Sequence, residues 1–151
     1  MFRLRGVNAK GILHVAELDI PANAITCIVG ESGSGKTTLL RLLNKMDSCD
    51  EGEIWFEHSP IDEIDSIELR RQVIMVPQTP VMFNGTVQDN LQIGLSFAGK
   101  PPATDERLMQ ALHVACLDKD LLQDVESLSG GEKQRLALAR AILMDPMAFL
   151  L

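Results

Sequence analysis

The chain has 151 residues, enough for one domain with a packed core and short for two. Its net charge of −7 argues against direct nucleic-acid binding, which needs a basic surface. We find no signal peptide and no apolar run long enough to span a bilayer, so we expect any membrane association to be peripheral, through a partner. The cysteines lack the spacing of a C-x-x-C pair. This favours reduced core residues, Cys27 and Cys116 among them, and a cytosolic compartment.

Three segments near the start predict strands. Residues 2–7 and 13–20 alternate apolar and charged side chains, which predicts half-exposed strands joined by a turn at 8–11. Residues 24–29 form a β-branched, almost wholly apolar run, which predicts a buried parallel strand.

A glycine-rich segment follows this run. It consists of Gly30, Glu31, Ser32, Gly33, Ser34, Gly35, Lys36 and Thr37. The residues from Thr38 to Lys45 predict a helix packed on a sheet. A turn between strand and helix directs backbone N–H groups and the helix dipole at one spot, which suits a phosphate chain. Lys36 would reach the β- and γ-phosphates and Thr37 would bind Mg²⁺. A chance glycine-rich turn is the alternative, and the order of strand, motif and helix argues against it.

The middle of the chain changes character at Pro77. Residues 53–57 predict a strand, residues 61–71 a short acidic helix or loop, and residues 73–76 a second buried strand that Pro77 stops. Beyond it, prolines and glycines punctuate the sequence, and the apolar spacing at 108–115 marks a helix. This pattern predicts a small helical insertion rather than more sheet.

A second glycine motif opens a long helix that runs to Met144. Ser129 and Glu132 have the spacing of a capping box, which explains those two residues. The capping box does not explain Gly130 and Gly131, because each glycine in a helix costs about 1 kcal/mol relative to alanine. Paired glycines are explained if a phosphate of another molecule approaches the backbone at this second helix N-terminus.

In combination, these motifs resemble the nucleotide-binding domain of ATP-binding-cassette (ABC) transporters. Gly30 to Thr37 matches the Walker A motif, and Gln78 matches the Q-loop glutamine. Leu128 to Glu132 matches the family signature, with glutamate in the last place where glutamine is commonest. Met147 to Leu151 matches the apolar strand that carries Walker B, and the stretch from Gln78 to Leu91 resembles some exporters and a bacterial subfamily linked to metal or iron export.

The resemblance implies an α/β fold of the P-loop NTPase class. Such a fold has a RecA-like parallel core sheet, N-terminal antiparallel strands and a small helical insertion, and here we expect it to be incomplete at the C-terminus. The single domain would divide into an ATP-binding core at 1–77, a helical insertion at 78–128 and the signature helix with the start of the Walker B strand at 129–151.

The resemblance also implies an ATPase subunit that couples ATP binding and hydrolysis to transport. The Walker A residues from Gly30 to Thr37, together with Thr38, would hold the phosphates. Lys36 and Gln78 would be catalytic, and Thr37 and Gln78 would bind Mg²⁺. The expected partners are a transmembrane permease and a second ATP-binding domain, paired head to tail at the cytoplasmic face of a membrane of the bacterial type. Across that pair, Ser129, Gly130 and Gly131 would bind the γ-phosphate of the other subunit's ATP.

Two departures from the family pattern carry expectations. The turn at 8–11 offers no aromatic residue to stack on adenine, which predicts weak base selectivity. The Walker B aspartate and the catalytic glutamate would follow Leu151, so we expect the 151-residue chain to bind ATP but hydrolyse it poorly. For the same reason we expect exposed backbone and apolar surface at 25–29.

Two other classes of protein fit the Walker A motif. A soluble ABC ATPase acting on nucleic acid or ribosomes is the alternative to a transporter subunit, but the short acidic segment between Gln78 and Ser129 lacks the coiled coil or basic insertion of such proteins. A P-loop kinase or GTPase is disfavoured by the paired glycines. The basic side chains of the last long helix, including Arg140, are interpreted as solvated or ion-paired charges.

Overall fold

A four-stranded antiparallel sheet begins the chain. In the computed structural model, which describes residues 1–151, the strands are ordered β2 (Leu13–Ile20), β1 (Phe2–Ala9), β3 (Glu51–Phe56) and β4 (Ser59–Pro60). Buried and more exposed residues alternate in β1 on either side of Gly6, and the alternation changes phase there. The hairpin turn lies at residues 10–12 rather than at the predicted 8–11, because Asn8 and Ala9 still pair with β2.

Two glycines allow β1 and β3 to approach closely. The register between these strands shifts between Arg5 and Asn8, around Gly6. Opposite this irregularity Gly52 has φ of +89°, and a Cβ placed on it would lie 2.4 Å from the carbonyl oxygen of Gly6. A side chain at position 52 would therefore collide with the backbone of the neighbouring strand.

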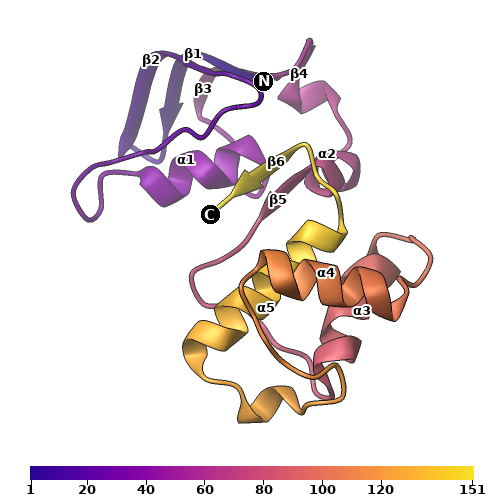
Figure 1. The fold of residues 1–151 in the computed structure, drawn as a ribbon. Helices are drawn as coiled ribbons and strands as arrows, with labels where there is room; N and C mark the ends of the chain where they lie inside the picture. Colours follow the sequence, from indigo (N-terminus) through magenta and orange to yellow (C-terminus); the bar gives the residue numbers. More distant parts are fainter. The chain divides into compact units, whose positions relative to one another are not determined.

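One helix covers a face of this sheet. Figure 1 shows α1 (Lys36–Leu43) lying along the sheet, and its buried side chains are Leu39, Leu42 and Leu43. The 3₁₀ turn η1 (Ile61–Glu63), α2 (Ser66–Gln72) and β5 (Val73–Met75) follow. These elements complete the first of two units, Met1–Met75.

The segment at 24–29 does not form the predicted buried strand. It contains no strand, and the side chains of Ile25 and Val29 are 96% and 89% exposed. A strand needs neighbouring backbone to pair its N–H and C=O groups, and an apolar run alone does not supply that neighbour. The expected exposure of backbone and apolar surface at 25–29 is what the structure shows.

The second unit, Val76–Leu151, is built around one long helix. Its elements are α3 (Val87–Phe97), α4 (Asp105–Val114), the 3₁₀ turn η2 (Val125–Ser127), α5 (Gly130–Leu143) and β6 (Ala148–Leu150). Both α3 and α4 pack on α5 (Figure 1). The fully buried leucines of this core are Leu91, Leu95, Leu108, Leu112 and Leu136. The predicted helix at 108–115, the long helix from Ser129 and the apolar strand near the end are all present.

Two cations hold the end of α5. The Lys100 ammonium donates to the carbonyl oxygen of Met144, and Arg107 Nη2 donates to that of Leu143 over 3.1 Å. Positive charge at a helix C-terminus is favourable because the dipole leaves the last carbonyl groups partly negative. Side chains that follow α3 and lie in α4 therefore fix the C-terminal end of α5.

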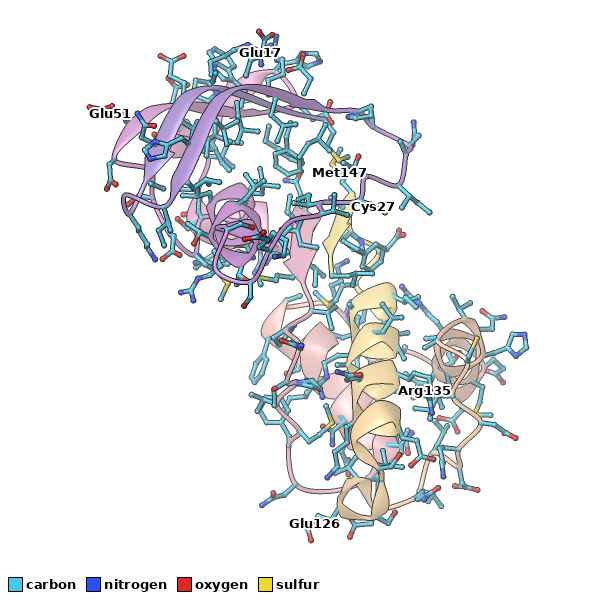
Figure 2. The ribbon with its side chains drawn as sticks, turned by 90° about the vertical axis from the view of Figure 1, so that its left-hand side faces the viewer. Glu17, Cys27, Glu51, Glu126, Arg135 and Met147 are labelled. Atoms are coloured by element: carbon cyan, nitrogen blue, oxygen red, sulfur yellow. The ribbon has the colours of Figure 1, made fainter.

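The cysteines are not core residues as predicted. All three are free thiols, and both Cys27 and Cys116 are exposed. Cys27 lies in the segment without strand structure, where Figure 2 labels it. Cys116 lies beyond the last residue of α4 and has φ of +53°. It therefore does not continue the helix or its buried face.

Candidate nucleotide-binding site

The glycine-rich loop from Gly30 to Gly35 winds tightly into the start of α1. Ser34 N–H donates to the Glu31 carbonyl over 3.3 Å, and both Gly33 and Gly35 have positive φ, +83° and +89°. Such φ values are strained for residues with a side chain. The glycine spacing seen in the sequence therefore corresponds to a backbone that doubles back before the helix begins.

The N-terminus of α1 is left without a cap. Gly35 is the N-cap residue and offers no side chain, and the first turn contains no acidic residue. The other helices have such groups: Asp65 caps α2, capping boxes close α3 and α5, and α4 begins with two acidic residues. The first N–H groups of α1 are thus available to an anion, and the helix dipole favours one.

Lys36 bends back over the loop. Its ammonium donates to the carbonyl oxygens of Gly30, over 2.8 Å, and Glu31, over 2.6 Å. An ammonium group has three donors, so one remains for a ligand above the loop. The positive charge therefore lies at the start of the loop that leads into the uncapped end of α1.

These residues fit a phosphate chain with a divalent cation. The loop adjoins the uncapped N-terminus of α1 and carries the Lys36 ammonium, and a Cβ placed on Gly33 would meet nothing within 4 Å, so the loop leaves room for a ligand there. Thr37, in the first turn of α1, is exposed and carries the hydroxyl that suits Mg²⁺. A bound Mg²⁺ would neutralise part of the phosphate charge.

Gln78 belongs to the second unit. Its side chain is exposed, and its carbonyl oxygen accepts a hydrogen bond of 2.8 Å from Gln134 Nε2. Because Gln134 lies on α5, the helix that begins at the paired glycines also fixes the backbone of Gln78. The structure therefore links two of the predicted site segments within this unit.

The turn at Ser129 forms the capping box that its spacing suggested. Ser129 Oγ accepts from the Glu132 N–H over 3.4 Å, and Glu132 Oε2 accepts from both the N–H and the hydroxyl of Ser129, each over 2.8 Å. Glu132 Oε1 pairs with the ammonium of Lys119 over 2.8 Å. These contacts lower the pKa of Glu132 to about 2, the bond from Lys119 having the largest effect and those from Ser129 adding to it.

The paired glycines have no role in the packing of this unit. A Cβ on Gly130 would meet nothing within 4 Å, and one on Gly131 would meet only the end of Arg135, at 3.7 Å. Neither residue has a positive φ. Neither conformation nor packing within the chain therefore demands glycine at these two positions. Figure 2 shows Arg135 on α5 and Glu126 just before this turn.

Sequence reasoning missed two features of the second unit. Lys119 belongs to no motif, and only the structure pairs it with Glu132. Arg140, interpreted from sequence as a solvated or ion-paired charge, is largely buried and has no acidic partner. Its guanidinium donates to the carbonyl oxygens of Asn90 and Val81, over 2.9 and 3.1 Å, and lies 5.3 Å from the centre of the Phe83 ring. Burial lowers the pKa of Arg140.

Comparisons with known proteins agree on one family. Residues 13–151 match the ABC transporter family. Protein STAR1 of Oryza sativa is 41% identical over 156 residues, which cover 99% of this chain and 45% of that protein. The phosphate import ATP-binding protein PstB 3 of Natronomonas pharaonis is 39% identical over 150 residues, covering 92% of this chain and 54% of that protein.

Solved structures agree with the sequence matches. A bacterial Atm1-family ABC exporter with ATP bound superposes with a TM-score of 0.85 at 30% identity, over 96% of this chain and 27% of that one. CbiO1 of Clostridium perfringens, part of the ABC transporter complex cbiONQ, also gives 0.85, at 25% identity, over 98% of this chain and 63% of that one.

The chain belongs to the ABC transporter family, and its fold is that of the family's P-loop nucleotide-binding domain. It spans about half the length of the first curated relatives it matches. None of its helices is both long and apolar enough to cross a membrane.

Proposed function

We propose that this chain is the ATP-binding part of a transporter ATPase subunit. In that role it binds ATP with Mg²⁺ and takes part in the coupling of ATP hydrolysis to transport. The observation that carries the proposal is the uncapped N-terminus of α1 beneath a glycine loop, with the Lys36 ammonium fixed beside it. The family match and its ATP-bound structural relative support the same conclusion.

Each residue of the proposed nucleotide site has a role that follows from its chemistry. The loop from Gly30 to Gly35 and the N–H groups of Lys36, Thr37 and Thr38 bind the phosphates, because each offers a donor to an anion. Lys36 stabilises negative charge on the transferred phosphoryl group. Thr37 and Gln78 carry the oxygen atoms that a hard cation prefers.

The turn at Ser129 binds the nucleotide of a second copy. It offers Ser129 at the N-cap, the N–H groups of Gly130 and Gly131, and no side chain on either glycine to obstruct the approach. ATP then joins two domains head to tail through charge-assisted hydrogen bonds on both sides, and loss of the γ-phosphate weakens the pair. A transmembrane permease is the second partner, and it places the chain at the cytoplasmic side of a membrane. The export-like interpretation of the stretch from Gln78 to Leu91 stays a prediction.

Calorimetric titration of ATP and Mg²⁺ into the complete protein tests the nucleotide site. We expect Lys36→Met to weaken ATP binding at least tenfold, since a charge-assisted bond contributes about 1.5–3 kcal/mol. Lys133→Met removes a lysine of α5 for which the structure records no ion pair, and it should bind like the wild type. Equal binding by the Lys36→Met variant would contradict the proposal. Recovery of the complete protein from membranes with an integral partner tests the transport role.

A further inference from the structure

The carboxylate of Glu132 serves two partners at once. One oxygen holds the N–H and hydroxyl of Ser129, and the other holds the ammonium of Lys119 at 2.8 Å. The side chains of Lys119 and Glu132 are only 25% and 21% exposed. The contact therefore differs from a fully solvated surface pair, whose geometry is loosely fixed.

Lys119 is held in place by the chain on both sides of it. Leu117 is buried, and its N–H donates to the Leu112 carbonyl over 2.9 Å. After it, the Asp120 carboxylate accepts from the N–H of Leu122 over 2.7 Å. These hydrogen bonds order the backbone on both sides of Lys119, so less backbone entropy is lost when its ammonium pairs with Glu132.

Glutamate at position 132 creates an electrostatic difficulty for the proposed function. A carboxylate in the first turn of α5 stabilises the helix, but it repels a triphosphate that approaches the same turn. Together with Lys119, Glu132 forms a pair without net charge, so the turn can accept an anion while keeping the hydrogen bonds of the capping box.

We propose that Lys119 is a positioning residue for the signature turn. It neutralises Glu132 and holds that carboxylate against Ser129, so that the N–H groups of Gly130 and Gly131 are presented to the nucleotide of a second copy. This inference rests on the proposed function, because it assigns a role at the turn that is proposed to meet the partner's ATP. Lys119 itself need not contact the nucleotide.

The test measures how much non-hydrolysable ATP analogue, with Mg²⁺, is needed to pair two copies of the complete protein, by light scattering. We expect Lys119→Met to raise the half-maximal concentration about tenfold, as for loss of a partly buried charge partner. Adding Glu132→Gln to that variant should restore pairing to within about threefold of the wild type, since the glutamine oxygen can still accept from Ser129. Lys133→Met is the matched control and should change nothing.

Two further measurements separate this inference from damage to the fold and from failure of the proposed function. Thermal unfolding and analogue binding to the unpaired protein should be the same for the double variant and the wild type. Normal pairing by Lys119→Met, or a double variant as weak as Lys119→Met, would overturn the role of Lys119 while leaving the proposed function intact. Normal pairing by Ser129→Ala would overturn the proposed role of the turn, and this inference with it.

Discussion

The buried side-chain oxygen of Asn90 accepts a hydrogen bond from Arg140 Nη2 over 2.9 Å, and this contact joins α3 to α5. Asn90 is 0% exposed and also bonds both backbone groups of Phe83. The Asn90 amide thus bonds both the Arg140 guanidinium of α5 and the backbone of the segment that precedes α3. These two side chains together hold the backbone of Val81 and Phe83 by hydrogen bonds.

Replacing Asn90 should destabilise the second unit. In Asn90→Ala, the Phe83 N–H and part of the Arg140 guanidinium would lose buried partners, which costs about 1–3 kcal/mol. Denaturant unfolding of the complete protein, followed by a probe in this unit, measures the change. Asn84→Ala, at an exposed asparagine of the same segment, should leave the free energy of unfolding within about 0.5 kcal/mol of the wild type. Equal stability of both variants would show that the amide is dispensable.

Gly130→Ala should weaken ATP-dependent pairing without lowering the stability of the fold. A methyl group at this position meets nothing in its own chain, so the free energy of unfolding should stay equal or rise by up to about 1 kcal/mol. The same methyl group would obstruct a phosphate at the helix N-terminus, and ATP-dependent pairing should fall. Thermal unfolding and light scattering on the same samples provide both readouts. Unchanged pairing would mean that no ligand comes close to this glycine.

The carboxyl group of Glu132 should titrate at about pH 2 rather than near its ordinary value of 4.5. A lowered folded-state pKa contributes stability that is present above about pH 4.5 and is lost as the pH falls toward 2. In Lys119→Met the largest cause of the shift is absent, so the pKa should move up toward 4.5. Carbon-13 NMR of the side-chain carboxyl measures it directly. A pKa near 4.5 in the wild type would contradict the pairing with Lys119.

Nucleotide binding should discriminate little between bases. The turn between β1 and β2 has no aromatic side chain, and Lys10 within it is paired with Asp47 over 2.8 Å. Base stacking, which contributes about 1–3 kcal/mol where it occurs, is therefore missing from this turn. Competition between ATP and GTP for the complete protein should give nearly equal affinities. A strong preference for adenine would show that another residue recognises the base.

Local patterns predicted most of the helices and strands, and they placed both glycine motifs at the start of a helix. Alternation marked β1 and β2, and the capping-box spacing marked the start of α5 to within one residue. The failures concern contacts between distant residues. The run at 24–29 has the composition of a strand, but pairing depends on neighbours that composition does not specify. Lys119 and Arg140 likewise acquire their roles from residues 13 and 50 positions away, to which no local spacing refers.

Helix α5 is anchored at three levels: Gln134 holds the backbone of Gln78 near its start, Arg140 holds Asn90 and Val81 further along, and Lys100 with Arg107 secures its last carbonyl groups. Unwinding either end of this helix would therefore also break hydrogen bonds to side chains or backbone outside it. A shift of α5 relative to these segments would have to stretch or break the hydrogen bonds that hold the backbone of Gln78 and Val81.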